Sequence, residues 1–433
     1  MTAVSPRRRR EIIDALRRGT VPQRGLDVMA VGLDRFQPTV DDELDVVASG
    51  GAVFKAVRGE YGAGKTFFSR WLTESAKQRG FATAEVQISE TETPLHRLET
   101  IYRRVTENLS TEAIGPSAFR DVVDGWFRTL EEDAIASGAD DHDVDARTDS
   151  LLAQRLASVS KTAPSFAAAL RGYQAAVRAG EVAAADGLLA WLGGQPSVAA
   201  SVRRTAGIRG DLDHFAAFGF LQGLLTVLRD SDYQGLVLVL DEVETLQRVR
   251  SGVREKSLNA LRQLLDEVDA GRFPGLYVLI TGTPAFYDGT QGMQRLPPLA
   301  ARLSVDFSGD PRWDNPRAPQ VRLLGFQHSG LVELGRRVRD IYSAGSSAAD
   351  RIAVELDDAR LEDFATAVAG QLGGKAGIAP RVFLRKLVDV LDKLEQFPDF
   401  ELDTGAAARL VGAELNEDER AAVSGLDAIE LDV

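Results

Sequence analysis

The sequence predicts an α/β protein with a five-stranded parallel core, a large helical insertion and a C-terminal helical lid domain. Three observations predict this class. A short apolar run at residues 52–57 leads into a glycine-rich loop and then a helical pattern. An uninterrupted apolar run at 236–240 is typical of a strand buried on both faces of a parallel sheet. Long helical stretches rich in Ala, Leu and Arg lie between and after the strand patterns.

Composition limits the functions that the chain can have. Its 433 residues, 44% hydrophobic, suffice for two or three domains. With no cysteine, neither a disulfide framework nor a thiolate metal site is available. No signal segment or membrane span is evident, so we expect a soluble cytoplasmic protein with no membrane partner. The net charge of −13 argues against coating nucleic acid by bulk electrostatics, although it leaves a local basic surface open.

The predicted elements divide the chain into five parts. A run of arginines at 7–10 lies in the first of them, and it forms either a nucleic-acid contact or, as we favour, the solvated face of an amphipathic helix. The insertion is much longer than an ordinary crossover, and its acidic stretch 140–149 is the best candidate for a mobile loop. Strands are expected at 52–57, 83–88, 236–240, 276–280 and 320–324. The parts are an N-terminal helical segment (1–48), the α/β core (49–94 and 231–326), the helical insertion (95–230), the helical lid (327–398) and an acidic tail (399–433).

The glycine-rich loop carries the clearest chemical signal. It matches G-x-x-x-x-G-K-[ST], with a strand before it and a helix after it, as this phosphate-binding motif requires. Glycines let the backbone N–H groups wrap a polyphosphate closely. Lys65 is expected to reach the β- and γ-phosphates, and the Thr66 hydroxyl to ligate Mg²⁺. We therefore expect a nucleoside triphosphate, ATP, to be bound by Gly59, Glu60, Tyr61, Gly62, Ala63, Gly64, Lys65, Thr66 and Phe67.

Acidic side chains follow the buried strand at 236–240. Asp241 stands at its carboxyl end, where α/β sheets place their ligand chemistry, and is expected to hold Mg²⁺ together with Thr66. Glu242 is expected to orient and deprotonate the attacking water. A helix-capping role would explain one acid here but not the pair.

Three further residues are candidates for the reaction. Thr283, just after the next strand, would hydrogen-bond the γ-phosphate or the water, with Thr281 as its competitor. Arg381 opens the last long lid helix and Arg302 follows the fourth strand, the latter facing a neighbouring subunit's nucleotide. Either arginine would stabilise charge on the transferred phosphoryl group, and either can instead be an ordinary surface arginine.

These motifs together resemble an AAA+ ATPase, and within that superfamily the ATP-binding proteins of bacterial BREX phage-defence loci. The resemblance implies a homo-oligomer that hydrolyses ATP in antiviral defence. The family is similar to the origin-recognition and helicase-loader branch, which implies action on DNA or delivery of a helicase or other defence-system protein. The phrases that carry the resemblance span nearly the whole chain: 16–22, 58–66, 240–246, 281–284 and 377–381.

The sequence also bears on DNA contact. The roughly 35 residues after 398 are too few for the winged-helix domain of origin-recognition proteins, so we do not expect sequence-specific reading by that route. A basic segment after the strand at 236–240 is the favoured DNA surface, with a solvated loop as an equal alternative. Its residues are Arg248, Arg250, Arg254 and Lys256, of which Arg254 also competes with Arg302 for the neighbour's nucleotide.

Two functions from different classes remain. The first is an Mg²⁺-dependent ATPase that assembles and acts on DNA or loads a partner. The second is a slowly hydrolysing, nucleotide-gated scaffold that binds partner proteins without touching DNA. The Asp241–Glu242 pair favours the first, because a pure switch does not need a positioned base.

Overall fold

The computed structural model describes residues 4–140, 142–371, 380–410 and 420. The chain forms two compact units. The insertion unit comprises Val40–Ala56 and Ser75–Val305, and the lid unit comprises Met1–Thr39, Val57–Glu74 and Asp306–Val433. Across the described residues, no helix combines the length and the apolar character needed to cross a membrane.

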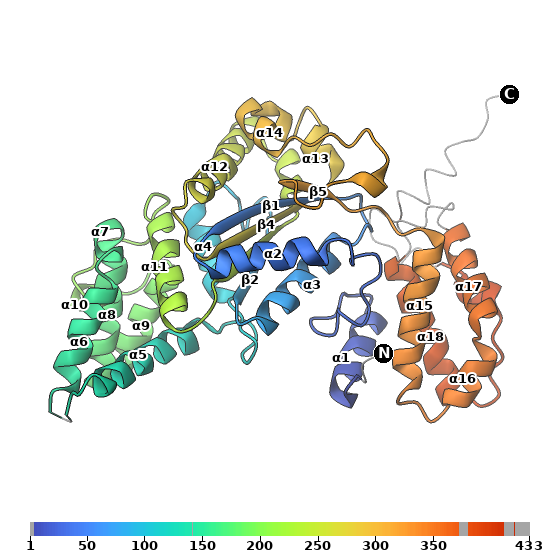
Figure 1. Cartoon of the computed structure of the whole chain (residues 1–433), viewed down its shortest axis with the longest axis horizontal. Helices are drawn as coiled ribbons and strands as arrows, with labels where there is room; N and C mark the ends of the chain where they lie inside the picture. The colour runs from blue at the N-terminus through green and yellow to red at the C-terminus, as the bar shows by residue number, and fades with distance from the viewer. Residues whose placement is uncertain (1–3, 141, 372–379, 411–419, 421–433) are drawn as a thin grey trace. The chain divides into compact units, whose positions relative to one another are not determined.

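Five strands form one sheet in the order β2-β3-β4-β1-β5 (Figure 1). β2 pairs in parallel with β3, from Ala82 opposite Leu236 to Gln87 opposite Asp241, and β3 pairs in parallel with β4. The apolar runs of β3 and β4 are buried on both faces, as predicted. The strands are β1 (Ala52–Arg58), β2 (Ala82–Gln87), β3 (Leu236–Asp241), β4 (Leu276–Gly282) and β5 (Gln320–Arg322).

Helix α2 (Gln37–Ala48) is fastened to the sheet by a buried polar group in the insertion unit. Its Glu43 carboxylate pairs with Lys55 of β1 at 2.5 Å and accepts a hydrogen bond from the Tyr277 hydroxyl of β4 at 2.7 Å. Burial raises the pKa of Tyr277, so its hydroxyl stays protonated and keeps donating. The buried lysine is thus paired rather than left as an isolated charge.

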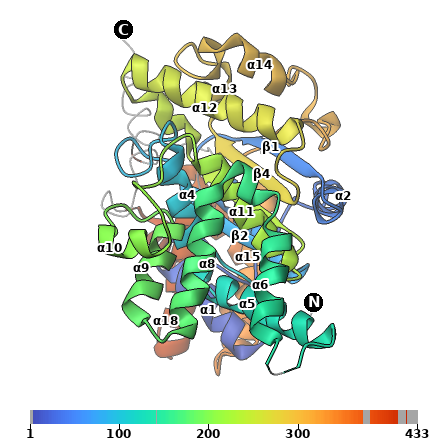
Figure 2. The same cartoon turned by 90° about the vertical axis from the view of Figure 1, so that its left-hand side faces the viewer.

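Between β2 and β3 the described residues form a series of helices joined by loops, and the helices pack on one another in Figure 2. One core of buried aromatic and aliphatic side chains, including Trp126, Phe166 and Phe220, joins these helices to the sheet. The prediction of a mobile loop at 140–149 is wrong in part, because helix α6 already begins at Val144. Two aspartates of this helix, Asp145 and Asp149, form ion pairs with Arg178. The helices are α4 (Leu98–Glu107), α5 (Phe119–Ala136), α6 (Val144–Arg155), α7 (Val159–Thr162), α8 (Pro164–Arg178), α9 (Val182–Leu192), α10 (Ala200–Thr205) and α11 (Ala217–Asp230).

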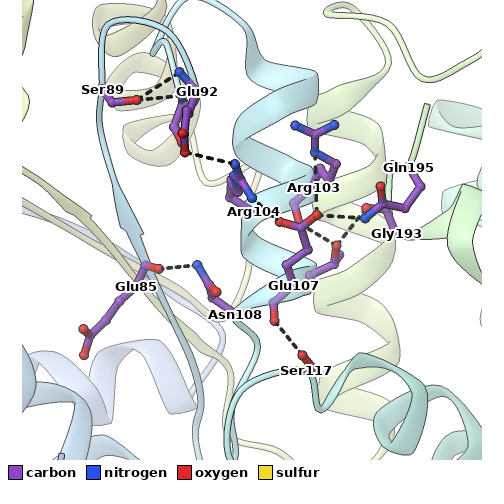
Figure 3. Close-up of polar contacts among 12 residues, drawn as sticks. Glu85, Ser89, Glu92, Arg103, Arg104, Glu107, Asn108, Ser117, Gly193 and Gln195 are labelled. Atoms are coloured by element: carbon purple, nitrogen blue, oxygen red, sulfur yellow. Dashed lines mark hydrogen bonds and ion pairs between the residues drawn. The ribbon is translucent and has the colours of Figure 1, made fainter.

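A polar hub on α4 joins β2 to the helical insertion (Figure 3). The Glu107 carboxylate accepts hydrogen bonds from Arg104 and from Gln195, each at 2.8 Å. The adjacent Asn108 donates to the carbonyl of Glu85 in β2 at 2.8 Å, and Ser117 donates to the carbonyl of Glu107. Because one helix end binds the strand and the insertion together, the position of β2 is tied to that of the insertion.

The rest of the insertion unit follows β3 and β4. After β3 come η1 (Val243–Gln247) and α12 (Ser251–Asp269). After β4 come α13 (Pro284–Asp288), η2 (Met293–Arg295) and α14 (Pro297–Leu303).

The lid unit brings the N-terminal helix together with the C-terminal helices. α1 (Pro6–Arg17) begins with the Ser5 cap and a proline in its first turn, and buries Ile12 and Leu16 in the core of the lid helices. Arg7 pairs with Glu11 at 3.1 Å and Arg8 with Asp27, which fits a solvated helix face. Arg17 donates two hydrogen bonds, of 2.7 and 2.8 Å, to the carboxylate of Asp392.

Helices α16 and α17 lie beside α15 and α18 in Figure 1. α3 begins at the phosphate loop. Residues 377–379 of the predicted lid motif and most of the predicted acidic tail lie outside the described residues. The elements are α3 (Lys65–Gln78), η3 (Pro311–Trp313), α15 (His328–Ser343), α16 (Ala349–Glu355), α17 (Asp358–Gln371), α18 (Pro380–Gln396) and α19 (Thr404–Ala408).

Candidate nucleotide-binding site

The phosphate loop connects β1 to α3. Gly62 and Gly64 have φ angles of +80° and +91°, a left-handed backbone that side chains rarely adopt. Lys65 is the first residue of α3 and is buried, with its ammonium donating to the carbonyl of Gly59 at 2.9 Å and lying 5.0 Å from the Tyr61 ring. Thr66 follows in the first helical turn. The loop thus has the backbone shape and the helix N-terminus that a polyphosphate requires.

Phe67, the residue after Thr66, contributes its side chain to the core of the lid unit. Phe67 is half-buried and packs against the hydrophobic core formed by α1 and the lid helices. The phosphate loop is thereby attached to the lid helices through the helix that it opens.

The predicted acidic pair lies at the end of β3. Asp241 Oδ1 accepts hydrogen bonds from the Thr281 hydroxyl and, at 3.1 Å, from the backbone N–H of Glu242. Glu242 has a φ of +60°, an unusual backbone for a glutamate. Its Oε2 accepts a hydrogen bond of 2.9 Å from the side-chain amide of Gln87 in β2. The two carboxylates are therefore oriented by different neighbouring strands.

The side chains of Thr281 and Gln87 hydrogen-bond the acidic pair. Thr281 is buried in β4, and its hydroxyl donates to Asp241. Thr283 is also buried and lies immediately before α13. Gln87 was missed by sequence reasoning, although its place at the carboxyl end of β2, opposite Asp241, is the signal that identifies it.

The two candidate arginines occupy different units. Arg302 of α14 pairs with Asp266 and Asp269 of α12, at 3.0 and 2.6 Å. Arg381 lies in the first turn of α18, near the residues that follow α1. A Cβ added to Gly19 of that segment would lie 3.3 Å from Nη1 of Arg381. Arg70 of α3 donates to the carbonyl of Val21 in the same segment. Residues 19–21 therefore link α3 to the start of α18.

The basic segment after η1 contains two kinds of residue. Arg254 is only 8% exposed and donates to the carbonyls of Leu246, Gln247 and Val249 at 2.9–3.0 Å. These bonds join η1 to α12, so its burial does not favour a DNA contact. Arg248, Arg250 and Lys256, by contrast, are exposed.

Comparison with known proteins identifies the family. A family model described as "BREX system ATP-binding protein BrxC/D" matches residues 4–408. The chain belongs to that family. The predicted BREX family is confirmed, and the five-stranded sheet with its helical regions agrees with the predicted α/β fold. As a BREX ATP-binding protein, the chain is an ATP-binding component of a phage-defence system.

Other comparisons add little. The solved structure of the ORC2 protein of Aeropyrum pernix, in ADPNP–ADP complexes, is similar with a TM-score of 0.34 and 10% identity. The match covers 92% of this chain and 80% of that one. No functionally curated protein matches the chain.

Proposed function

We propose that this BREX ATP-binding protein is an Mg²⁺-dependent ATPase that acts in the cytoplasm. The observation that carries the proposal is the oriented acidic pair, with Asp241 held by Thr281 and Glu242 held by Gln87. A protein that only binds ATP does not need a carboxylate fixed as a base for water. Asp241 ends β3 and Glu242 follows it, at the sheet edge where α/β proteins place their ligand chemistry.

Mg²⁺ fits the donors that the chain offers. Among the described residues, no cluster of three or more His, Asp or Glu side chains forms a protein-only metal cage. Mg²⁺ with a nucleotide needs no such cage, because one or two protein oxygens together with phosphates and waters complete its shell. Thr66 and Asp241 would supply those oxygens. Bound there, Mg²⁺ would neutralise charge on the β- and γ-phosphates.

The activity would be used in an assembly of several copies. Arg302 is proposed to reach the nucleotide of the next subunit, while Arg381 and Thr283 contact the nucleotide of their own chain. ATP-dependent assembly would act on DNA or load a DNA-processing partner such as a helicase. Exposed Arg248, Arg250 and Lys256 support DNA contact because they carry three cations on an otherwise acidic protein.

A second function, a slowly hydrolysing scaffold, has one observation in its favour. The Gln87 amide occupies Oε2 of Glu242, so the base accepts a protein hydrogen bond in this conformation. If that bond persists with ATP, hydrolysis would be slow and the nucleotide would act as a switch.

Replacing Glu242 by Gln separates the two functions. The amide cannot accept the proton of water, so turnover should fall by about 10²–10⁴-fold while ATP binding stays intact. Phosphate release and nucleotide binding measured on the same preparation check this. Lys65→Ala is the matched control, because it should lose binding as well. Equal turnover in Glu242→Gln and wild type would remove Glu242 from the mechanism, whereas turnover near background in the wild type would favour the scaffold.

A further inference from the structure

One tryptophan of this chain is exposed to solvent. Of the four tryptophans, Trp71, Trp126 and Trp191 are buried, whereas Trp313 in η3 of the lid unit is 81% exposed. Exposed tryptophans concentrate at binding surfaces, since the indole ring combines a large contact area with few rotatable bonds. Trp313 is thus a candidate contact for a ligand outside the nucleotide site.

The turn that carries Trp313 is braced by arginines. Arg322 makes two hydrogen bonds to Asp314, at 2.9 and 3.0 Å, and a third to the carbonyl of Phe307 at 3.0 Å. Arg35 donates to the carbonyl of Pro311 at 3.1 Å and to that of Arg322 at 3.0 Å. These bonds already order the turn in the folded chain. A ligand that binds Trp313 therefore does not lose free energy by ordering a flexible loop.

A second brace holds the start of the same loop. The Phe307 ring has the guanidinium groups of Arg58 and Arg322 near its faces, each 5.0 Å from the ring centroid. Arg58 belongs to β1, so the loop is fastened to the sheet strand that precedes the phosphate loop. The exposed indole is therefore displayed by a fixed structure rather than by a loose loop.

Charged residues of both signs lie near Trp313 in the sequence, and they differ in their partners and in their exposure. Asp314 is turned inward onto Arg322, and Asp310 accepts from the backbone N–H of Arg312 at 2.9 Å and from its guanidinium. The side chain of Arg312 remains 80% exposed, and Arg317 is exposed as well. An exposed aromatic ring with exposed arginines before and after it in the chain offers the stacking face and the cations that unpaired bases and their phosphates use.

We propose that Trp313, Arg312 and Arg317 form a contact for single-stranded DNA, which rests on the proposed action on DNA. One unpaired base stacks on the Trp313 indole, and the flanking guanidinium groups contact the phosphates. Arg312 exchanges its exposed partner Asp310 for a phosphate at little cost, because water and salt screen an ion pair at the surface. Duplex DNA lacks an accessible base face, so the contact selects single strands.

Intrinsic fluorescence tests the stacking directly. Because the other three tryptophans are buried, iodide should quench mainly Trp313. Adding an oligothymidylate should quench the emission and protect the remainder from iodide. Trp313→Phe should lose that signal while keeping most of the affinity, since phenylalanine still offers a ring. Titrations at several protein concentrations separate DNA binding from self-association.

Affinity measurements supply the decisive comparison. In anisotropy titrations with a labelled oligothymidylate, Trp313→Ala should weaken binding roughly tenfold or more, as expected for one lost base stack. Replacing Arg312 and Arg317 by Ala should flatten the salt dependence. Phe215→Ala is the matched control, because Phe215 is 90% exposed in the insertion unit and should not affect binding.

Three results would overturn the proposal. One is equal affinity of wild type and Trp313→Ala for the oligonucleotide. Another is a Trp313→Ala variant that loses self-association but binds DNA normally, which would make the indole a protein contact. The last is wild-type protein that hydrolyses ATP but does not bind single-stranded DNA. That result would contradict the proposed DNA contact and leave the ATPase proposal standing. Absent hydrolysis in wild type would instead sink the ATPase proposal.

Discussion

At the scale of single residues, the acidic pair at the end of β3 depends on donors from neighbouring strands. Asp241 and Glu242 are adjacent in sequence, yet one is bound by Thr281 of β4 and the other by Gln87 of β2. A motif shows the two acids but not the groups that orient them. Parallel pairing brings these groups together, because the carboxyl ends of neighbouring strands meet at one edge.

Thr281→Val should raise the Mg²⁺ concentration that the ATPase requires. Valine has nearly the shape of threonine but lacks the hydroxyl, so Asp241 loses a donor that fixes its orientation. We expect about a 10-fold shift in the Mg²⁺ titration of phosphate release. Thr281→Ser keeps the hydroxyl and should restore the wild-type titration. An unchanged Mg²⁺ requirement in Thr281→Val would remove this contact from the metal site.

At the scale of elements, arginine side chains hold together segments that lack regular pairing. Arg254 joins η1 to α12 through three carbonyls, and Arg322 holds the loop before β5. Sequence reasoning treats such arginines as exposed charges, because most are. Which arginine is buried depends on carbonyl groups that converge only in the folded chain.

Arg254→Ala should destabilise the protein rather than weaken DNA binding selectively. The change leaves three carbonyls without their donor, which costs on the order of 3 kcal/mol of unfolding free energy. Denaturant unfolding measures this. The exposed neighbour Lys256→Ala is the control and should stay within about 0.5 kcal/mol. A stable Arg254→Ala variant with weak DNA binding would return Arg254 to the DNA surface.

At the scale of the whole molecule, the proposed assembly needs residues that leave their own chain. Arg302 is bound to Asp266 and Asp269 in this structure, so a role at a neighbouring nucleotide requires those pairs to open. Both acids are partly exposed, and exposed pairs contribute only about 0–1 kcal/mol. The pairs are therefore compatible with an arginine that changes partner on assembly.

Arg302→Ala should lower turnover only in assembled protein. Mixed with Lys65→Ala, it should regain part of the activity, because some interfaces then pair an intact phosphate loop with an intact arginine. Phosphate release from mixtures of confirmed co-assembly measures the recovery. Two inactive parents that stay inactive when co-assembled would place the function of Arg302 within its own chain.

The exposed cations after η1 should give DNA binding that rises with ATP and falls steeply with salt. Assembly gathers Arg248, Arg250 and Lys256 from several copies around one DNA molecule. Replacing all three by Ala should flatten the salt dependence and leave ATP binding unchanged. Anisotropy with labelled DNA at two salt concentrations, with and without ATP, checks this. Identical titrations of wild type and variant would favour the scaffold function.

The sequence by itself determined the phosphate loop, the acidic pair, the buried strands and the family, because each is a local pattern of contiguous residues. The tertiary structure decided which side chains face those motifs. Gln87 lies 155 positions before Glu242, yet the two side chains are hydrogen-bonded. Burial of Arg254 depends on carbonyl groups 5 to 8 positions away, which converge on its guanidinium only once η1 and α12 have formed. Hydrogen bonds and packing act through space, so local patterns do not encode them residue by residue.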